Sequence, residues 1–135
     1  MKTIIFSTLI LLTVTGCATR LPEDELRLTR NRLEHYLTNN AMTQSEMNIL
    51  SQNMVILADM ERYWLEYRIW NQSNYDKIEK SFMADCEAWE KRADAEAKKP
   101  SEFEGGSMAP TDHNLRMTGF IEKRIDELKT KWRQK

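Results

Sequence analysis

The sequence predicts an all-α fold, a small bundle of three to four helices, on two observations. Apolar residues recur at steps of three and four through most of the chain beyond residue 21, and no alternating β pattern occurs there. Glycine (4 residues) and proline (3 residues) are scarce, which disfavours a turn-rich β fold. The 135 residues suit a single helical domain, which we expect to cover residues 23–135.

The first two helices have clear start signals. Pro22 suits the first turn of a helix, and three acidic residues follow it and favour the positive end of the helix dipole. This helix should end near residues 39–40. The sequence Thr-Gln-Ser-Glu at 43–46 predicts the next start, because the side chains of Thr43 and Glu46 can each accept a hydrogen bond from the other residue's backbone amide.

The helix that follows carries two adjacent apolar stripes. The first stripe consists of Met47, Leu50, Met54, Leu57, Trp64 and Arg68. The second stripe consists of Ile49, Ile56, Met60, Tyr63, Tyr67 and Trp70. Two stripes predict a wide apolar face, so we expect this helix to lie at the centre of the bundle.

Two further helices are expected. The polar residues 71–74 interrupt the pattern, and apolar side chains then recur to Trp89 before the segment turns polar and stops at Pro100. Residues 100–110 should form a loop. The last helix should begin near Thr111 or Asp112. Its expected buried face consists of Met117, Ile121, Ile125, Leu128 and Trp132.

The N-terminus has the pattern of a bacterial lipoprotein. Residues 3–15 follow a positive charge and are apolar and uncharged, too short to span a bilayer but long enough for a signal segment. Val-Thr-Gly-Cys at 14–17 resembles the lipobox, in which small residues precede a cysteine that receives lipid. We therefore expect residues 1–16 to be removed and Cys17 to be lipidated, with a tether over residues 17–22. The alternative is an ordinary secretory signal with a chance cysteine.

The residue after Cys17 indicates the membrane that carries the anchor, and the number of cysteines indicates the state of Cys86. Ala18 stands where an aspartate would favour retention in the inner membrane, so we expect an outer-membrane anchor with the domain facing the periplasm. If Cys17 carries lipid, Cys86 has no partner within the chain. Cys86 lies on an apolar stripe, so a buried, inert thiol is expected, with a reactive site as the alternative.

The net charge and the absence of catalytic motifs disfavour a nucleic-acid-binding protein, a metalloprotein and an enzyme. The net charge of the full chain is −1, and it becomes −2 once residues 1–16, with Lys2 as their single charge, are removed. This charge gives no reason to expect nucleic acid as a binding partner. His35 and His113 have no metal-type spacing. No nucleophile elbow, phosphate-binding loop or zinc-protease motif occurs, so we expect no enzyme, metal, cofactor or small-molecule substrate.

Three segments together resemble a known family. They are Trp-Leu-Glu-Tyr-Arg at 64–68, Gly-Gly-Ser-Met-Ala-Pro at 105–110, and Arg124 with Leu128. In the same order they resemble the Trp-Leu-x-Tyr-Arg segment, the Gly-Gly-Ser-x-Ala-Pro loop and the closing Arg-x-x-x-Leu of the lysozyme inhibitor LprI N-terminal domain, a family of small, helical, exported bacterial proteins. The resemblance implies a helical fold and a role in binding lysozyme-type hydrolases.

The chain departs from the family at its usual cysteines. Members carry one cysteine four residues after the arginine of the first motif and another about ten residues after the Gly-Gly pair. These positions here are Gln72 and Arg116, so a disulfide that the resemblance implies is absent. An extra helix holding Tyr75 to Trp89 is expected between the motifs.

A protein-binding role is the resulting hypothesis, with a cell-wall hydrolase such as lysozyme as the preferred partner. The candidate binding loop consists of Gly105, Gly106, Ser107 and Met108. A structural role is expected for the motif residues Trp64, Tyr67, Arg68, Arg124 and Leu128. Trp64 should lie in the core, and the two arginines should cap carbonyls or pair with Glu61 or Asp126. An immunity lipoprotein against a toxin delivered to the periplasm, and an adaptor of an envelope complex, remain alternatives.

Overall fold

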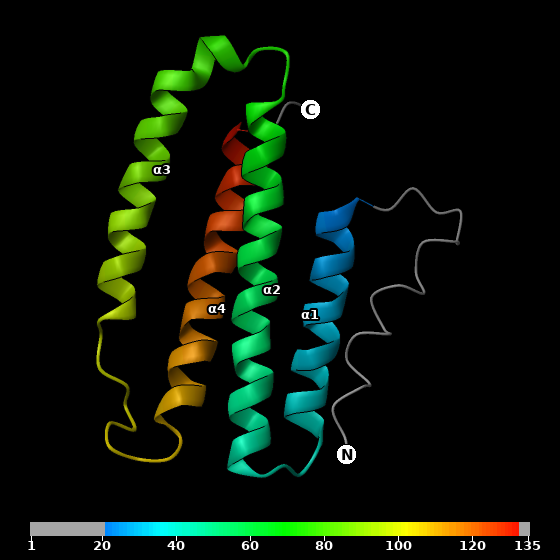
Figure 1. Cartoon of the computed structure of the whole chain (residues 1–135), viewed down its shortest axis with the longest axis vertical. Coiled ribbons are helices and arrows are strands. Elements are labelled where there is room, and N and C mark those ends of the chain that lie inside the picture. Colours follow the sequence, from blue (N-terminus) through cyan, green and yellow to red (C-terminus); the bar gives the residue numbers. More distant parts are fainter. Residues whose placement is uncertain (1–20, 133–135) are drawn as a thin grey trace, which may run out of the picture.

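The computed structural model describes residues 21–132 and contains four α-helices and a closing π-helical turn (Figure 1). The elements are α1 (Pro22–Asn39), α2 (Gln44–Trp70), α3 (Tyr75–Ala97), α4 (Ala109–Glu127) and η1 (Leu128–Trp132). No strand occurs within this span, so the predicted all-α bundle is confirmed. The expected cleavage site and the lipidation at Cys17 lie outside the described residues.

The helix starts follow the local chemistry of the sequence. The capping box of α2 is formed, since the Thr43 amide donates to Glu46 Oε2 at 2.8 Å and the Glu46 amide donates to Thr43 Oγ1 at 3.3 Å. Helix α4 begins at Ala109, two residues before the expected start. Pro110 fits this first turn because its missing N–H would have no helical partner there.

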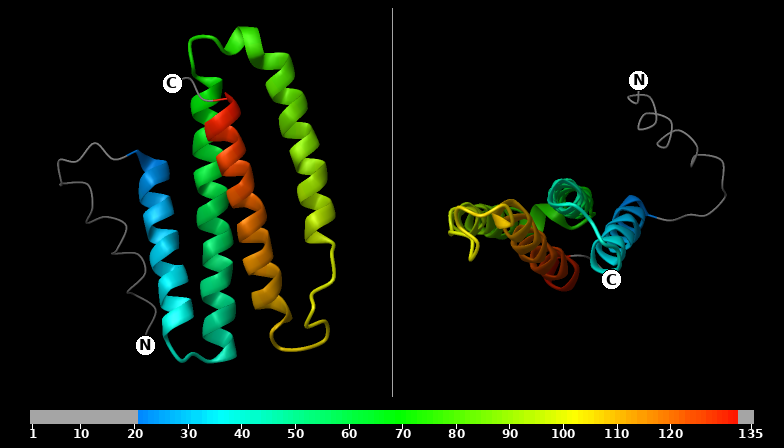
Figure 2. Two further views of the ribbon diagram at one scale, coloured as in Figure 1. Left: turned by 180° about the vertical axis from the view of Figure 1, so that it is seen from behind. Right: turned by 90° about the horizontal axis from the view of Figure 1, so that it is seen from below.

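The helices alternate in direction along the bundle, and α2 and α4 form its centre. Helix α1 packs along α2, α4 packs along the length of α2, and α3 touches α2 at few residues. Helices α1 and α3 therefore lie on opposite sides of the α2–α4 pair (Figure 2). The buried apolar core lies among α2, α3, α4 and η1, and it consists of Ala58, Leu65, Ile69, Phe82, Trp89, Ile121, Ile125 and Leu128.

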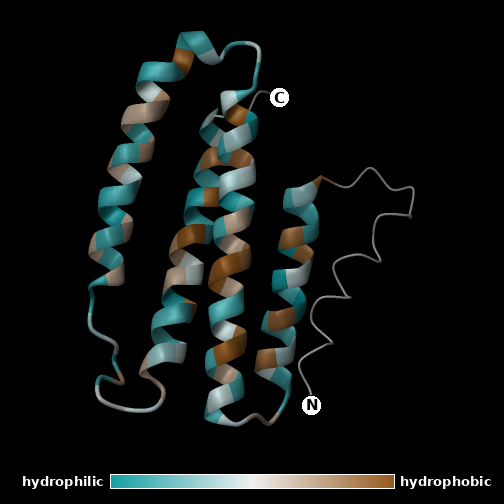
Figure 3. Ribbon diagram, viewed as in Figure 1, coloured by the Kyte–Doolittle hydropathy of each residue, from teal (hydrophilic) through white to brown (hydrophobic). Residues whose placement is uncertain are grey.

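Helix α2 buries one face, and the expectation that both of its apolar stripes are buried is wrong. Its buried residues are Ser51, Met54, Ala58, Glu61, Arg62, Leu65 and Ile69. The whole second predicted stripe, from Ile49 to Trp70, is exposed to between 45% and 59%. Helix α3 makes few contacts with α2 and leaves Tyr63 and Trp70 of this stripe exposed, and apolar stretches recur along the α2 ribbon (Figure 3).

Charged side chains join α1 to the rest of the bundle. Arg30 Nη1 donates to Glu61 Oε2 at 2.6 Å, and Arg30 Nε donates to Glu122 Oε1 at 3.0 Å. Lys129 Nζ approaches the other oxygen of Glu61 at 2.9 Å. Because Arg30 and Glu61 are both buried, this cluster fixes α1 against α2, α4 and η1 at one height.

Within residues 21–132, no helix is both long and apolar enough to cross a bilayer.

Candidate protein-binding groove

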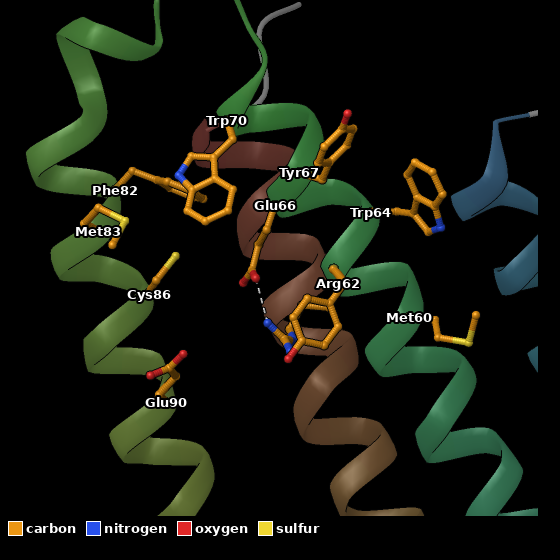
Figure 4. A pocket seen from close by; sticks show the side chains of 11 residues that line it. Met60, Arg62, Trp64, Glu66, Tyr67, Trp70, Phe82, Met83, Cys86 and Glu90 are labelled. Atoms are coloured by element: carbon orange, nitrogen blue, oxygen red, sulfur yellow. Dashed lines mark hydrogen bonds and ion pairs between the residues drawn. The ribbon is translucent and has the colours of Figure 1, made fainter.

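An open groove of about 670 Å³ lies between α2 and α3, where the two helices diverge (Figure 4). Most of its lining is apolar or aromatic. The lining consists of Met60, Arg62, Tyr63, Trp64, Glu66, Tyr67 and Trp70 of α2 and Phe82, Met83, Cys86 and Glu90 of α3.

The upper wall of the groove is aromatic and is supported from behind. Trp70 is 53% exposed, and its indole N–H donates to the Tyr75 hydroxyl. Phe82 is buried and packs edge-to-face against Tyr75 and Trp132, with ring centroids 6.2 Å and 5.3 Å away. Met83, on the α3 side, is 48% exposed. Large apolar side chains are thus offered to solvent on a rigid backing, which is typical of binding surfaces.

Arg62 forms the polar floor of the groove, and a second arginine, Arg124, is buried beside Glu66. The Arg62 guanidinium stacks between Tyr63 and Trp89, 4.1 Å and 4.6 Å from the ring centroids. It also donates to Glu66 at 2.7 Å and to Asp59 at 2.8 Å. This arginine therefore ties α2 to the face of an α3 tryptophan while its charge is neutralised by two acids of its own helix.

The second arginine, Arg124 of α4, is fully buried. Its Nη1 donates to Asp85 Oδ2 at 2.5 Å, its Nη2 lies 3.4 Å from the Cys86 sulfur, and its Nε lies 3.8 Å from Glu66 Oε1. Lys131 and Trp132 donate to the same Asp85 carboxylate. Arg124 thus connects α4 to both helices that form the groove.

Burial and charge shape the titration of the groove residues. Burial raises the pKa of Glu66 more than the neighbouring arginines lower it. Burial and the nearby Glu66 carboxylate raise the pKa of the Cys86 thiol, and Arg124 opposes them only in part. A thiol with a raised pKa is a weak nucleophile at neutral pH. Cys86 is half-buried rather than fully buried as expected, because it lines the groove.

The groove combines an apolar, aromatic surface with charged side chains. Within residues 21–132, no group of three or more metal-ligating side chains is close enough to hold an ion. The charges of the floor are paired with one another, whereas Glu90 is exposed at the lower edge. An apolar, partly aromatic ligand with one basic group would match this arrangement.

Trp64, Tyr67 and Arg68 of the first motif segment lie outside the core, whereas Leu65 between them is buried in it. Trp64 is 40% exposed, so its expected place in the core is wrong; it lies on the flank of α2 and points toward α1 (Figure 4). Tyr67 is 55% exposed and packs edge-to-face on Trp64. Arg68 forms an ion pair with Glu23 at the start of α1 instead of with the expected Glu61 or Asp126.

The second and third motif segments are located at different heights. Leu128 and Arg124 are buried, and Arg124 pairs with Asp85 rather than with the expected acids. The loop residues Gly105, Gly106 and Ser107 are exposed at the opposite end of the bundle from the α2–α3 turn, and Met108 is partly buried. Gly105 has φ +78°, a conformation that favours glycine.

The loop is folded back on the bundle rather than extended into solvent. The Gly106 amide donates to the Phe103 carbonyl at 2.8 Å, and the Ser101 hydroxyl donates to Asp112 at 2.6 Å. Arg116 of α4 donates to the carbonyls of Lys99 and Pro100 at 2.9 Å and 3.0 Å. These contacts therefore hold the loop against the start of α4.

The two positions at which the resembled family carries cysteines are far apart in this chain. Gln72 donates to the Trp132 carbonyl at 3.2 Å, at the α2–α3 end of the bundle. Arg116 lies at the loop end, with its Nε 3.5 Å from Glu96 Oε1 of α3. Helices α2 and α4 run parallel, and Gln72 follows the end of α2 whereas Arg116 lies near the start of α4, so the two residues are at opposite ends of the bundle. Cysteines at these two positions could not form a disulfide in this fold. Arg116 instead forms an ion pair that joins α4 to α3.

The groove itself was missed by reasoning from the sequence. Its exposed residues Tyr63 and Trp70 belong to the second stripe of α2, which periodicity alone assigns to the core. The stripe does signal an apolar surface, but the sequence does not say whether a neighbouring helix covers it. Comparisons of the chain with family models, curated proteins and solved structures give no match.

Proposed function

We propose that the protein is a lipid-anchored protein of the bacterial envelope that binds a protein partner through the groove between α2 and α3. The observation that supports this function most is the aromatic wall of the groove, where Tyr63 and Trp70 are exposed to 59% and 53%. Exposed aromatic and methionine side chains over a paired arginine floor are enriched at protein interfaces.

The proposed ligand is an amphipathic helix of the partner. A groove between two diverging helices accepts a third helix that inserts an apolar stripe. The partner helix should carry a lysine or arginine opposite Glu90, whose carboxylate is exposed at the lower edge. Arg62 and Glu66 already neutralise each other at 2.7 Å and add no net charge for the partner to match.

The partner class follows from the family resemblance, which favours a cell-wall hydrolase such as lysozyme. The contact surface differs from the one expected, because the Gly105–Met108 loop is folded against α4 whereas the groove is open. In this proposal, inhibition arises when the partner's exposed helix is held in the groove and access to its substrate cleft is blocked.

The test is inhibition of peptidoglycan lysis by the mature protein, with lysozymes of different net charge. Met83→Asp places a charge in the groove at a side chain that is 48% exposed, so the fold should survive and inhibition should fall at least tenfold. Leu115→Asp, at a 40% exposed leucine of α4 outside the groove, is the matched control and should leave inhibition unchanged. Ser107→Asp tests the loop in parallel.

The results separate three outcomes. Loss of inhibition with Met83→Asp alone supports the groove. Loss with Ser107→Asp alone would transfer the function to the loop. Absence of inhibition of any lysozyme would remove the hydrolase from the proposal.

The anchor is tested separately at Cys17. The substitution Cys17→Ser should abolish acylation and prevent removal of residues 1–16, and mass spectrometry of the membrane fraction measures both. A Cys17→Ser protein that is still processed and still sediments with membranes would contradict the proposed anchor.

A further inference from the structure

Three of the α2 residues that line the groove lie on the side of α2 that faces away from α3, toward α1. Met60 and Trp64 point toward α1, and Tyr67 points away from the bundle beside them (Figure 4). We call these three residues the α1-side patch. They are exposed to 45%, 40% and 55%, and the rings of Trp64 and Tyr67 pack edge-to-face at 5.8 Å.

This patch lies next to the start of α1. Glu23, in the first turn of α1, is buried and forms an ion pair with Arg68. Arg68 follows Tyr67 directly and comes one helical turn after Trp64. The first turn of α1 is therefore fixed against the part of α2 that carries the patch.

The length of chain before α1 limits the distance from the patch to the proposed lipid. Cys17 precedes Leu21 by four residues, and four residues span at most about 14 Å even when fully extended. Lipid on Cys17 would thus hold the start of α1 within about 14 Å of the lipid attachment point. The patch is then held close to the bilayer surface whichever way the tether runs.

The side chains of the patch suit that surface. Tryptophan and tyrosine favour the interface between headgroups and acyl chains, where the ring is buried and the polar tip stays hydrated. Arg68, which follows Tyr67 directly, is already paired with Glu23, so it is not free to attract anionic lipid. A bilayer of zwitterionic lipid should be sufficient.

We propose that the α1-side patch docks into the interfacial region of the bilayer that carries the anchor, an inference that rests on the lipid anchor proposed above. Docking fixes the orientation of the bundle. It places Met60, Trp64 and Tyr67 against lipid and leaves the α3 wall of the groove, with Met83 and Glu90, facing the aqueous side for the partner.

The test uses the mature lipidated chain in vesicles of phosphatidylcholine whose acyl chains carry bromine near the headgroup. Bromine quenches the fluorescence of tryptophans that enter the interface. Wild-type protein should be quenched relative to the same protein in unbrominated vesicles. The Trp64→Phe variant should lose most of this quenching, whereas Trp89→Phe, which removes a tryptophan of the core, should retain it.

Flotation of the vesicles distinguishes failure of the anchor from failure of the docking. A chain that carries no lipid and does not float overturns both. A lipidated chain that floats, but in which Trp64 is quenched no more than Trp89, overturns the docking and leaves the anchor intact. If Trp64 becomes shielded from solvent only when a protein partner is added, the patch binds that partner and the docking is also overturned.

Discussion

Replacing Glu61 with leucine tests the charge cluster that joins α1 to the bundle. Glu61 is fully buried and is shared by Arg30 at 2.6 Å and Lys129 at 2.9 Å. Without this carboxylate, Arg30 remains buried with Glu122 as its acidic partner. Breaking a buried ion pair on one side costs about 3–5 kcal/mol. We expect Glu61→Leu to lower the free energy of unfolding by that amount, out of the roughly 5–15 kcal/mol that a small domain has.

The double variant separates the loss of the charge pair from the loss of packing. In Arg30→Met the Glu61 carboxylate keeps Lys129, so the loss should be smaller than in Glu61→Leu. In Arg30→Met with Glu61→Leu, two apolar side chains replace the pair. Such replacements are often neutral, so the double variant should lie within about 2 kcal/mol of wild type. The two changes should therefore be strongly non-additive.

Urea unfolding followed by circular dichroism at the helix band measures these free energies. The slope with denaturant should be the same for all four proteins, which makes the midpoints directly comparable. A cost below about 1 kcal/mol for Glu61→Leu would refute the argument from burial. A double variant as unstable as the sum of the single changes would show that Arg30 and Glu61 contribute independently rather than as a pair.

Three further outcomes follow from burial, capping and titration. Phe82→Ala should cost about 3–5 kcal/mol because its ring is 1% exposed, whereas Met83→Ala, 48% exposed, should cost under about 1 kcal/mol in the same urea assay. Thr43→Ala should cost about 1 kcal/mol through loss of the capping box, and an unchanged midpoint would contradict this. Burial opposes ionisation of Asp85, but hydrogen bonds from two cations and an indole bring its pKa to about 2. Its contribution to stability is thus complete above about pH 4 and lost as the pH falls toward 2, and Asp85→Asn should flatten that part of the stability profile.

The helices were predictable because their signals are local. The capping box at Thr43, the proline at the start of α1 and the proline that follows α3 act on backbone within a few residues. The stepping of Phe82 and Trp89 by helical spacing likewise identifies buried positions of α3 correctly. Each of these features depends on sequence neighbours and not on how the helices assemble.

The groove between α2 and α3 was not predictable because it depends on which helices lie close to α2. Tyr63 and Trp70 have the composition and spacing of core residues, and they would be core if α3 lay closer. The position of α3 depends in turn on pairings between residues distant in sequence, such as Arg124 with Asp85. A helical pattern identifies an apolar face, but not the element that covers it.

The buried Arg124 also limits how the helices can slide past one another. Its acceptors, Asp85 on α3 and Glu66 on α2, are each available at a single axial level. A shift of α3 by one turn, about 5.4 Å, would keep apolar side chains in contact but would separate the Arg124 guanidinium from Asp85. An unpaired buried charge costs several kcal/mol, so alternative registers are excluded even though the apolar packing would tolerate them. The axial register of the α2 and α3 walls of the groove is consequently fixed, so binding of the proposed partner would require little reordering of these walls.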